Sequence, residues 1–155
     1  MLTIEQKACN DETWTHINRV QYYINIFVKE LIDRALNHDQ SKLKSPEVEA
    51  FTEVTPILKH LTYGSPEYIE NTNKLGDALK HHYAKNRHHP QHFKNGVDDM
   101  NLLDLVKMFC DWKAATERHN DGNIRKSIQI NADRNKYNIN PQLVKILENT
   151  VELFE

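Results

Sequence analysis

Apolar residues recur at helical spacing over most of the chain. Between residues 13 and 36 they follow one another at steps of three or four, at Trp14, Ile17, Val20, Ile24, Phe27 and Leu31. This spacing places them on one face of an α-helix. Residues 47–61 repeat the pattern, although Pro56 should kink or split that helix. The chain ends on a similar stripe, formed by Leu143, Ile146, Leu147, Val151 and Phe154.

The middle of the chain predicts three more helices. One should run over residues 66–88, because Pro90 disfavours helical geometry at the residue before it. A second, over about residues 100–119, is apolar nearly all round and should therefore be buried. A third and shorter helix is expected at residues 123–134. Four glycines and five prolines leave little turn material, so we expect an all-α, single-domain bundle of six or seven helices over residues 1–155.

Composition narrows the class of partner and the compartment. The formal net charge of −2, without a basic stripe and interleaved aromatics, argues against long nucleic acid as a substrate and gives no sign of a membrane surface. No run approaches the ~18 apolar residues of a membrane span, and the first residues do not form a signal peptide. Cys9 and Cys110 lie far apart in the sequence, which fits reduced thiols and a cytoplasmic location.

Histidine is the unusual component of this composition. Five of the nine histidines fall between His81 and His92. On a helix, His82 and His89 are seven residues apart and share a face, and His81 and His88 form the neighbouring row. Several imidazoles at one helix end suit a divalent transition metal or a phosphate-binding pocket. The alternative is a solvated polar face with scattered histidines.

Two acidic residues lie within the helix expected at residues 100–119. A buried carboxylate is costly unless it is paired or binds a metal. Asp111, between Cys110 and Trp112, is the better ligand candidate, and Asp104 should be partly solvated near the helix start. An internal salt bridge from Asp111 to Arg118 or to a lysine is the alternative.

The adjacent pair His38-Asp39 is the clearest candidate for a metal site. An imidazole and a carboxylate on consecutive residues can reach one ion, and the carboxylate can also bridge to a second. His16 could join them only if the chain turns back. One straight helix would separate His16 from His38 by about 33 Å, and residues 27–30, where a bend is expected, contain no glycine or proline.

The order His16, His38-Asp39, Asp111 resembles the H…HD…D signature of the HD-domain superfamily of metal-dependent phosphohydrolases. Those proteins are all-helical, and the four residues hold a catalytic divalent metal. More narrowly, HDQSK at residues 38–42, Glu47, His82, NRHH at 86–89 and CDW at 110–112 resemble a small family of phage and bacterial HD-like proteins. The chain departs from the superfamily in its short spacing between His16 and His38, and in HDQSK where HDxGK is usual.

The resemblance implies a site with one or two divalent transition-metal ions, with Mn, Fe, Co, Ni and Zn not distinguished. Its first-metal ligands would be His16, His38, Asp39 and Asp111. Asp39 would bridge to a second ion completed by His82 and by His88 or His89. Lys42 would neutralise phosphate charge, and Glu47 or His89 would protonate the leaving oxygen. Acid should strip such a site near pH ~6.5 or below, because neutral histidines bind metal.

The expected function is therefore hydrolysis of a nucleotide or other small phosphoester by a metal-bound water. Two alternatives stay open. One is a di-iron oxygenase of the HD type, which the additional histidines allow. The other is a non-enzymatic phage or bacterial binding protein that a metal stabilises. The apolar stripe of the last helix has two candidate roles, internal packing or a homodimer interface.

Overall fold

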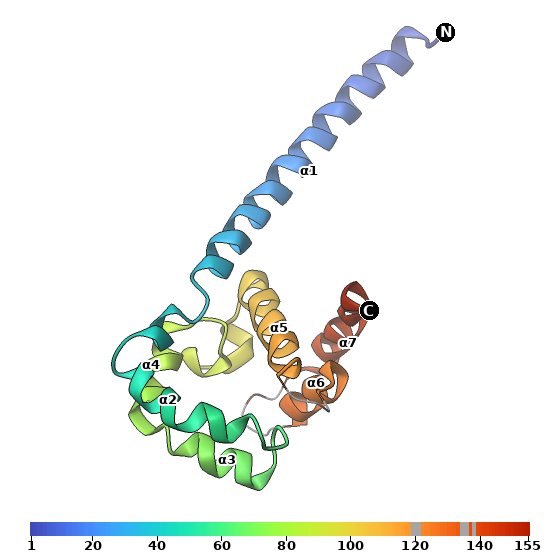
Figure 1. Cartoon of the computed structure of the whole chain (residues 1–155). Coiled ribbons are helices and arrows are strands. Elements are labelled where there is room, and N and C mark those ends of the chain that lie inside the picture. Colours follow the sequence, from blue (N-terminus) through green and yellow to red (C-terminus); the bar gives the residue numbers. More distant parts are fainter. Residues whose placement is uncertain (119–121, 134–136, 138) are drawn as a thin grey trace. The chain divides into compact units, whose positions relative to one another are not determined.

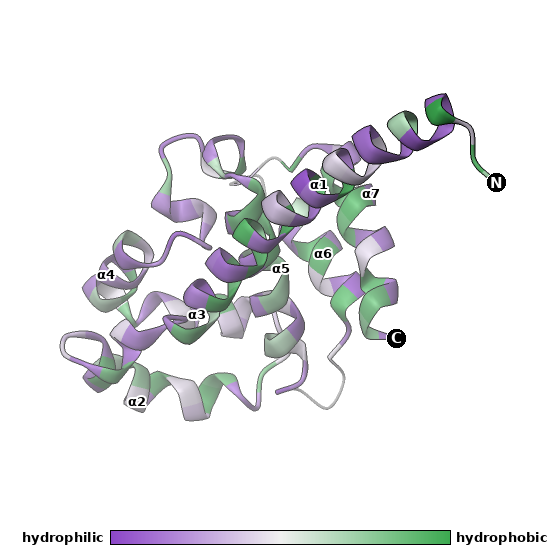
Figure 2. Ribbon diagram, turned by 90° about the horizontal axis from the view of Figure 1, so that it is seen from above, coloured by the Kyte–Doolittle hydropathy of each residue, from purple (hydrophilic) through white to green (hydrophobic). Residues whose placement is uncertain are grey.

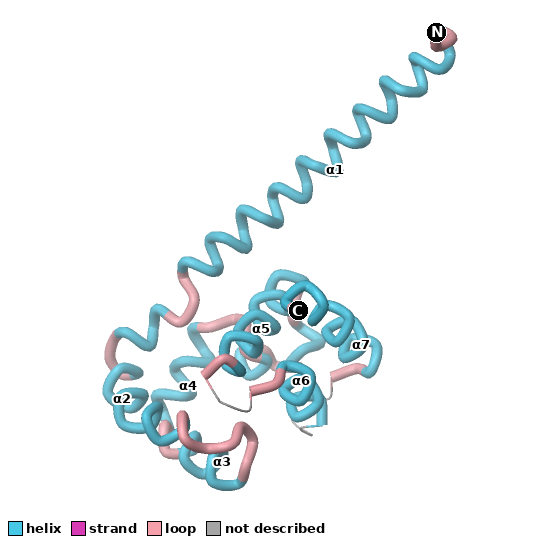
Figure 3. Tube along the Cα trace, turned by 45° about the vertical axis from the view of Figure 1, so that its right-hand side comes forward, coloured by secondary structure: helices cyan, strands magenta, loops and turns pink. Residues whose placement is uncertain are grey.

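The computed structural model describes residues 1–118, 122–133, 137 and 139–155. Within them the chain forms seven α-helices, four short 3-10 helices and no strand (Figures 1 and 3). The α-helices are α1 (Ile4–Leu36), α2 (Glu47–Leu58), α3 (Pro66–Asn73), α4 (Gly76–Lys85), α5 (Leu102–Thr116), α6 (Ile124–Asp133) and α7 (Pro141–Thr150). The prediction of an all-α chain with six or seven helices is confirmed. None of the described helices is both long enough and apolar enough to cross a membrane.

The chain divides into two compact units, Met1–Asn37 and His38–Glu155. The first unit is α1, whose start is capped by a reciprocal pair: the Thr3 side chain accepts from the Gln6 backbone, and the Gln6 side chain accepts from the Thr3 backbone. None of its residues is buried. The prediction of one domain over residues 1–155 stays a prediction.

The turn expected between His16 and His38 is not formed within α1. The helix continues without a break to Leu36, as its lack of glycine and proline favours. Twenty residues of helix separate His16 from Leu36, which is roughly 30 Å. The sequence-based condition for His16 to share a metal with His38 is therefore not met.

The second unit has its apolar core where α5, α6 and α7 pack side by side (Figure 2). The buried residues of this core are Phe109, Ile124, Ile128, Leu147 and Val151. Leu143, Leu147 and Val151 of the last stripe thus pack inward, whereas Ile146 is 53% and Phe154 46% exposed. The helix α5 is less enclosed than expected, since Leu102 is 66% exposed. It ends at Thr116, and the predicted end at His119 lies outside the described residues.

Two predicted helices differ from the structure around the histidine-rich segment. Pro56 does not split α2, which runs through it to Leu58. The helix expected over residues 66–88 is instead two helices, α3 and α4, and the second begins at Gly76, whose positive φ of 53° suits glycine. The second of them ends at Lys85, so His88 and His89 lie beyond it in a loop rather than on its face.

Candidate metal centre

His38 and Asp39 lie in a sharp backbone turn at the start of the second unit. Asp39 has φ 53° and ψ 20°, in the left-handed region that few non-glycine residues adopt but that aspartate tolerates. The turn continues into a 3-10 helix, Gln40–Leu43, and the Lys42 backbone N–H donates to the Asp39 carbonyl at 2.9 Å. Both side chains of the pair are consequently presented from the same short segment.

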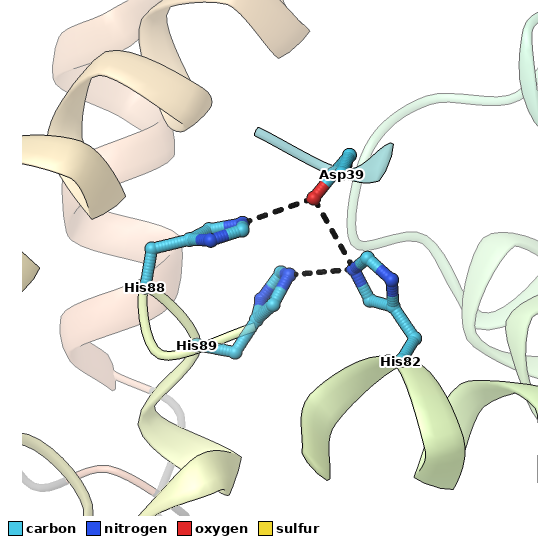
Figure 4. Close-up of side chains that lie close together, drawn as sticks. All are labelled: Asp39, His82, His88 and His89. Atoms are coloured by element: carbon cyan, nitrogen blue, oxygen red, sulfur yellow. Dashed lines mark hydrogen bonds and ion pairs between the residues drawn. The ribbon is translucent and has the colours of Figure 1, made fainter. Parts of the chain in front are cut away.

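The end of α4 and the loop after it bring three histidines close to Asp39, with His82 and His88 facing its carboxylate and His89 facing His82 (Figure 4). His82 lies in the last turn of α4, and Asn86 ends the helix with an extended backbone. The chain then doubles back, so that the His89 ring centroid lies 4.8 Å from that of His82 and 4.1 Å from that of His88. His82 and His88 are buried, at 2% and 1% exposure. The NRHH segment therefore contributes its histidines through the loop and not through helical periodicity.

Two groups of potential metal ligands form where these segments meet α5. The first, called the Asp111 group, contains His38, Asp39, His88 and Asp111; the second, called the His82 group, contains Asp39, His82, His88 and His89. In each group one donor atom per residue lies within 4.8 Å of the others. Asp39 and His88 belong to both. The sequence-based prediction that Asp39 joins two sets of ligands thus has a matching geometry.

Most of the distances from the histidines to the carboxylates are longer than a usual hydrogen bond, whereas His82 Nε2 and His89 Nε2 lie 2.9 Å apart. The Nε2 atoms of His38, His88 and His82 lie 3.4, 3.5 and 3.7 Å from the nearest Asp39 oxygen, and His38 Nε2 lies 3.4 Å from an Asp111 oxygen. Ligand bonds of about 2.0–2.2 Å place two ligands of one ion roughly 3–4 Å apart. The donor atoms are therefore spaced as ligands of a shared ion would be.

Two of these residues also carry buried polar atoms for which the described part of the chain offers no hydrogen-bond partner. They are Asp39 Oδ1 and both ring nitrogens of His88. Most buried polar atoms in proteins are hydrogen-bonded, and an exception calls for an explanation. A cation between the Asp39 oxygen and the His88 nitrogen would satisfy both.

The protonation states suit metal binding as well. Burial alone would raise the pKa of Asp39, but the Lys42 ammonium, 2.7 Å away, holds it below its ordinary value. Burial likewise opposes ionisation of Asp111, yet the hydrogen bond from His38 and the nearby histidines lower its pKa. Burial lowers the pKa of His88 to about 4 and that of His89 well below the usual 6.5. Ionised carboxylates and neutral imidazoles are the forms that bind transition metals.

Glu47 has a different role from the proton donor that the sequence predicted. Its side chain is fully buried and accepts hydrogen bonds from His81 Nδ1 at 2.7 Å, His82 Nδ1 at 2.8 Å and Ser41 Oγ at 3.0 Å. Burial would raise the pKa of Glu47, but these three hydrogen bonds bring it below its ordinary value. The carboxylate is thus ionised and cannot supply a proton. By accepting from Nδ1 it leaves a lone pair on Nε2 of His82, which lies 2.9 Å from His89 Nε2 and 3.7 Å from Asp39 Oδ1.

The other predicted catalytic residues are Lys42 and His89. Lys42 lies beside the candidate metal centre. Its ammonium is 2.7 Å from Asp39 Oδ2 and 4.9 Å from the Phe51 ring centroid. His89 Nε2 lies 2.9 Å from His82 Nε2, within the His82 group. Because the pKa of His89 is far below 6.5, its ring is neutral near pH 7. It is therefore placed as a ligand rather than as an acid for the leaving group.

Several sequence-based expectations for single residues need correction. His16 lies on α1 in the first unit, and no group of potential ligands found among the described residues includes it. Asp104, expected to be partly solvated, is fully buried and paired with Arg87 at 2.9 Å. Asp111 pairs with His38 and His88 rather than with Arg118.

Sequence reasoning missed the residues that hold the ligands in place. Ser41 and Asn86 are joined by a hydrogen bond of 2.9 Å, and Asn86 also donates to the His82 carbonyl. Ser41 in turn donates to Glu47. Ser41 lies in the HDQSK segment and Asn86 in the NRHH segment. The sequence therefore marked the segments, but neither residue is of a type that usually binds a transition metal.

We expect metal to stay bound at lower pH than the sequence alone predicted. Protons and metal compete for the same imidazole lone pair, and the lowered pKa of His88, about 4, makes protons weak competitors above that pH. After stepwise dialysis of loaded protein, elemental analysis should find most of the metal retained at about pH 5.5, with loss as the pH falls toward about 4. A peptide with solvent-exposed histidines is the control. Half-loss of the protein's metal near pH ~6.5 would show that the ligands are not these buried histidines.

Comparison with known proteins places the chain in a family. The family model described as "Family of unknown function (DUF5662)" matches residues 5–153. No curated protein and no solved structure matches the chain. The family match spans almost all of its 155 residues, including every residue of the two ligand groups. The chain therefore belongs to the DUF5662 family.

Proposed function

We propose that this protein is a metal-dependent phosphohydrolase of the HD-domain type, acting on a nucleotide or another small phosphoester. The observation that carries the proposal is the pair of ligand groups that share Asp39 and His88. Histidine nitrogens and aspartate oxygens together suit Mn, Fe, Co, Ni or Zn. A bound divalent ion would lower the pKa of a water ligand and so supply a nucleophile for phosphorus.

The geometry favours Asp39 as the bridge between two ions. A carboxylate has two oxygens and can bind two ions at once, whereas the single lone pair of one imidazole nitrogen can bind one. Oδ1 of Asp39 faces His82 and His88, and Oδ2 faces His38 and Lys42. The two oxygens thus face different sets of ligands.

Lys42 is the residue best placed to bind the phosphate group. Its ammonium is 2.7 Å from Asp39 and its side chain is 30% exposed, so it lies at the edge of the centre and remains reachable. The contact with the Phe51 ring favours this position through a cation–π interaction. From here Lys42 would neutralise a phosphoester oxygen beside the shared carboxylate.

A metal-reconstitution assay tests the proposal. Chelator-treated protein would be loaded separately with each of the five ions and incubated with nucleoside monophosphates and with p-nitrophenyl phosphate. We expect phosphate release that depends on the ion and falls at least about hundredfold in Lys42→Ala, since loss of one preorganised charge costs about that much. Lys126→Ala, an exposed lysine on α6, is the matched control. Stoichiometric metal binding without phosphate release for any ion would refute the hydrolase.

A di-iron oxygenase of the HD type is the second candidate. The two groups together hold four imidazoles and only two carboxylates, His38, His82, His88 and His89 with Asp39 and Asp111. This histidine-rich composition is the observation that favours it over a hydrolase. Protein loaded with iron(II) without oxygen and then exposed to it should consume oxygen if it is an oxygenase, and should not if it is a hydrolase.

A metal-stabilised binding protein is the third candidate. The exposed aromatic residues of α1 favour it, since Trp14 is 62% and Phe27 is 47% exposed. Such a protein would release no phosphate, consume no oxygen and bind its partner equally well after Lys42→Ala.

A cytoplasmic location is also part of the proposal. It is supported by the free cysteines Cys9 and Cys110.

A further inference from the structure

A cavity of about 710 Å³ lies in the second unit. It is bounded by one side of α4 and by the segment that follows the histidine loop, residues 90–96. Its volume lies within the ~300–1,000 Å³ that small-molecule sites usually have. Neither the candidate ligands nor Lys42 is among the residues that line it, so it is a separate feature of the unit.

The cavity and the candidate metal centre share a wall. Tyr83 lines the cavity, and its ring centroid lies 5.0 Å from that of His89 and 6.1 Å from that of His82. Pro90, another lining residue, directly follows His89. The Tyr83 carbonyl accepts a hydrogen bond from His92 Nδ1 at 3.0 Å, which ties the loop back to α4. A ligand in the cavity would therefore lie one aromatic ring away from two candidate metal ligands.

The lining has the chemistry of a site for a planar, anionic molecule. It combines aromatic rings, side-chain amides and lysines, represented by Tyr83, Phe93, Asn73, Asn95, Lys80 and Lys94. No carboxylate is found among its described lining residues. The Lys80 ammonium is paired with Asp77 at 2.8 Å. The Lys94 ammonium forms no ion pair within the described part of the chain, so it is the cation available to a ligand.

One lining residue also lacks a hydrogen-bond partner. Gln91 Oε1 is buried, and no donor reaches it within the described part of the chain. The exocyclic amino group of a nucleobase is a donor of the kind that this oxygen lacks. Stacking on aromatic rings and hydrogen bonds to amides are together the usual means by which proteins hold a base.

We propose that this cavity binds a nucleoside monophosphate, with the base on the rings of Tyr83 and Phe93 and the phosphate at the Lys94 ammonium. The inference goes beyond the proposed function, because it places a nucleotide beside the two ligand groups and not in them.

Calorimetric titration of chelator-treated protein tests the cavity without any turnover. The probes are adenosine 5′-monophosphate, adenosine and inorganic phosphate. We expect the nucleotide to bind more tightly than either fragment, since it alone engages the rings and the lysine together. Lys94→Glu and Phe93→Ala should each raise the Kd for the nucleotide about tenfold. Lys126→Glu, the same charge reversal at an exposed lysine of α6, should leave it unchanged.

The outcomes separate this inference from the proposed function. Nucleotide binding that Lys94→Glu and Phe93→Ala weaken, without phosphate release in the loaded protein, would support the cavity and refute the hydrolase. An equal Kd for the nucleotide in wild type, Lys94→Glu and Phe93→Ala would overturn the cavity site, and phosphate release by the loaded protein would then still support the hydrolase. Lys94 is exposed, so its variant keeps the test valid if Phe93→Ala fails to fold. Absence of nucleotide binding would also overturn the inference.

Discussion

Asp39→Asn should abolish stoichiometric metal binding while leaving the helical fold intact. Asp39 is shared by both ligand groups, so its substitution removes a charged ligand from each. Loss of a residue that merely supports a ligand already costs ~10–100-fold in metal affinity, so loss of the shared ligand should cost at least about hundredfold. Elemental analysis of protein purified without chelators, with circular dichroism as the fold check, measures the effect.

Asparagine is chosen because it tolerates the left-handed backbone of Asp39, with φ 53°, almost as well as aspartate. The backbone turn that carries His38 should therefore survive. Asp98→Asn, at an exposed aspartate outside both groups, is the matched control and should keep its metal. Wild-type metal content in Asp39→Asn would show that the centre is not built on this carboxylate.

The same measurement counts the ions. Asp111 belongs only to the first group and His89 only to the second. If the wild type holds two ions per chain, Asp111→Asn and His89→Ala should each retain about one, since each removes ligands from one group. If the wild type holds one ion, only one of the two variants should lose it.

Glu47→Ala should lower the free energy of unfolding by about 3–5 kcal/mol, because it leaves three buried or half-buried donors without their acceptor. Those donors are Ser41 Oγ, His81 Nδ1 and His82 Nδ1. This is a large part of the stability of a typical domain, which is about 5–15 kcal/mol. Urea unfolding at neutral pH, in the presence of a chelator, measures it.

Glu49→Ala is the control for this experiment. Glu49 lies in the same first turn of α2 but is exposed, so the two variants lose the same favourable charge at the helix start. Glu47→Gln should recover part of the stability, because its amide oxygen can still accept while its amino group cannot. Equal stability of the Glu47 and Glu49 variants would mean that the three hydrogen bonds contribute little.

Metal affinity gives a second readout for Glu47. Without the carboxylate, His82 is no longer held with its proton on Nδ1, and its Nε2 lone pair is less available. We expect a ~10–100-fold weaker metal affinity in Glu47→Gln. A purely structural role would change stability without this loss.

The structure reproduces part of the proximity that the sequence predicted for the candidate ligands. His38-Asp39, His82, His88 and Asp111 were selected by residue type and order, and the structure brings them together. The argument that placed His88 and His89 on a helical face was wrong, because α4 ends at Lys85. His16 had the residue type of a ligand, but α1 continues without the turn that the assignment needed.

The sequence by itself indicated the helical class, most of the helices and the residue types available for chemistry. Helical periodicity, capping and the scarcity of glycine are local properties, so they can be read without knowing how the helices pack. Its composition also made a metal site a candidate, because histidine is the commonest metal ligand among the side chains.

Only the tertiary structure decided which role each of these residues has. Glu47 pairs with His81 and His82, more than thirty positions away along the chain, and Asp39 meets His88 across a similar distance. Such contacts depend on the packing of α2 against α4 and on the loop after Lys85, which local spacing does not encode. Burial then follows from that packing, and burial is what keeps the histidines neutral and Asp39 Oδ1 without a partner.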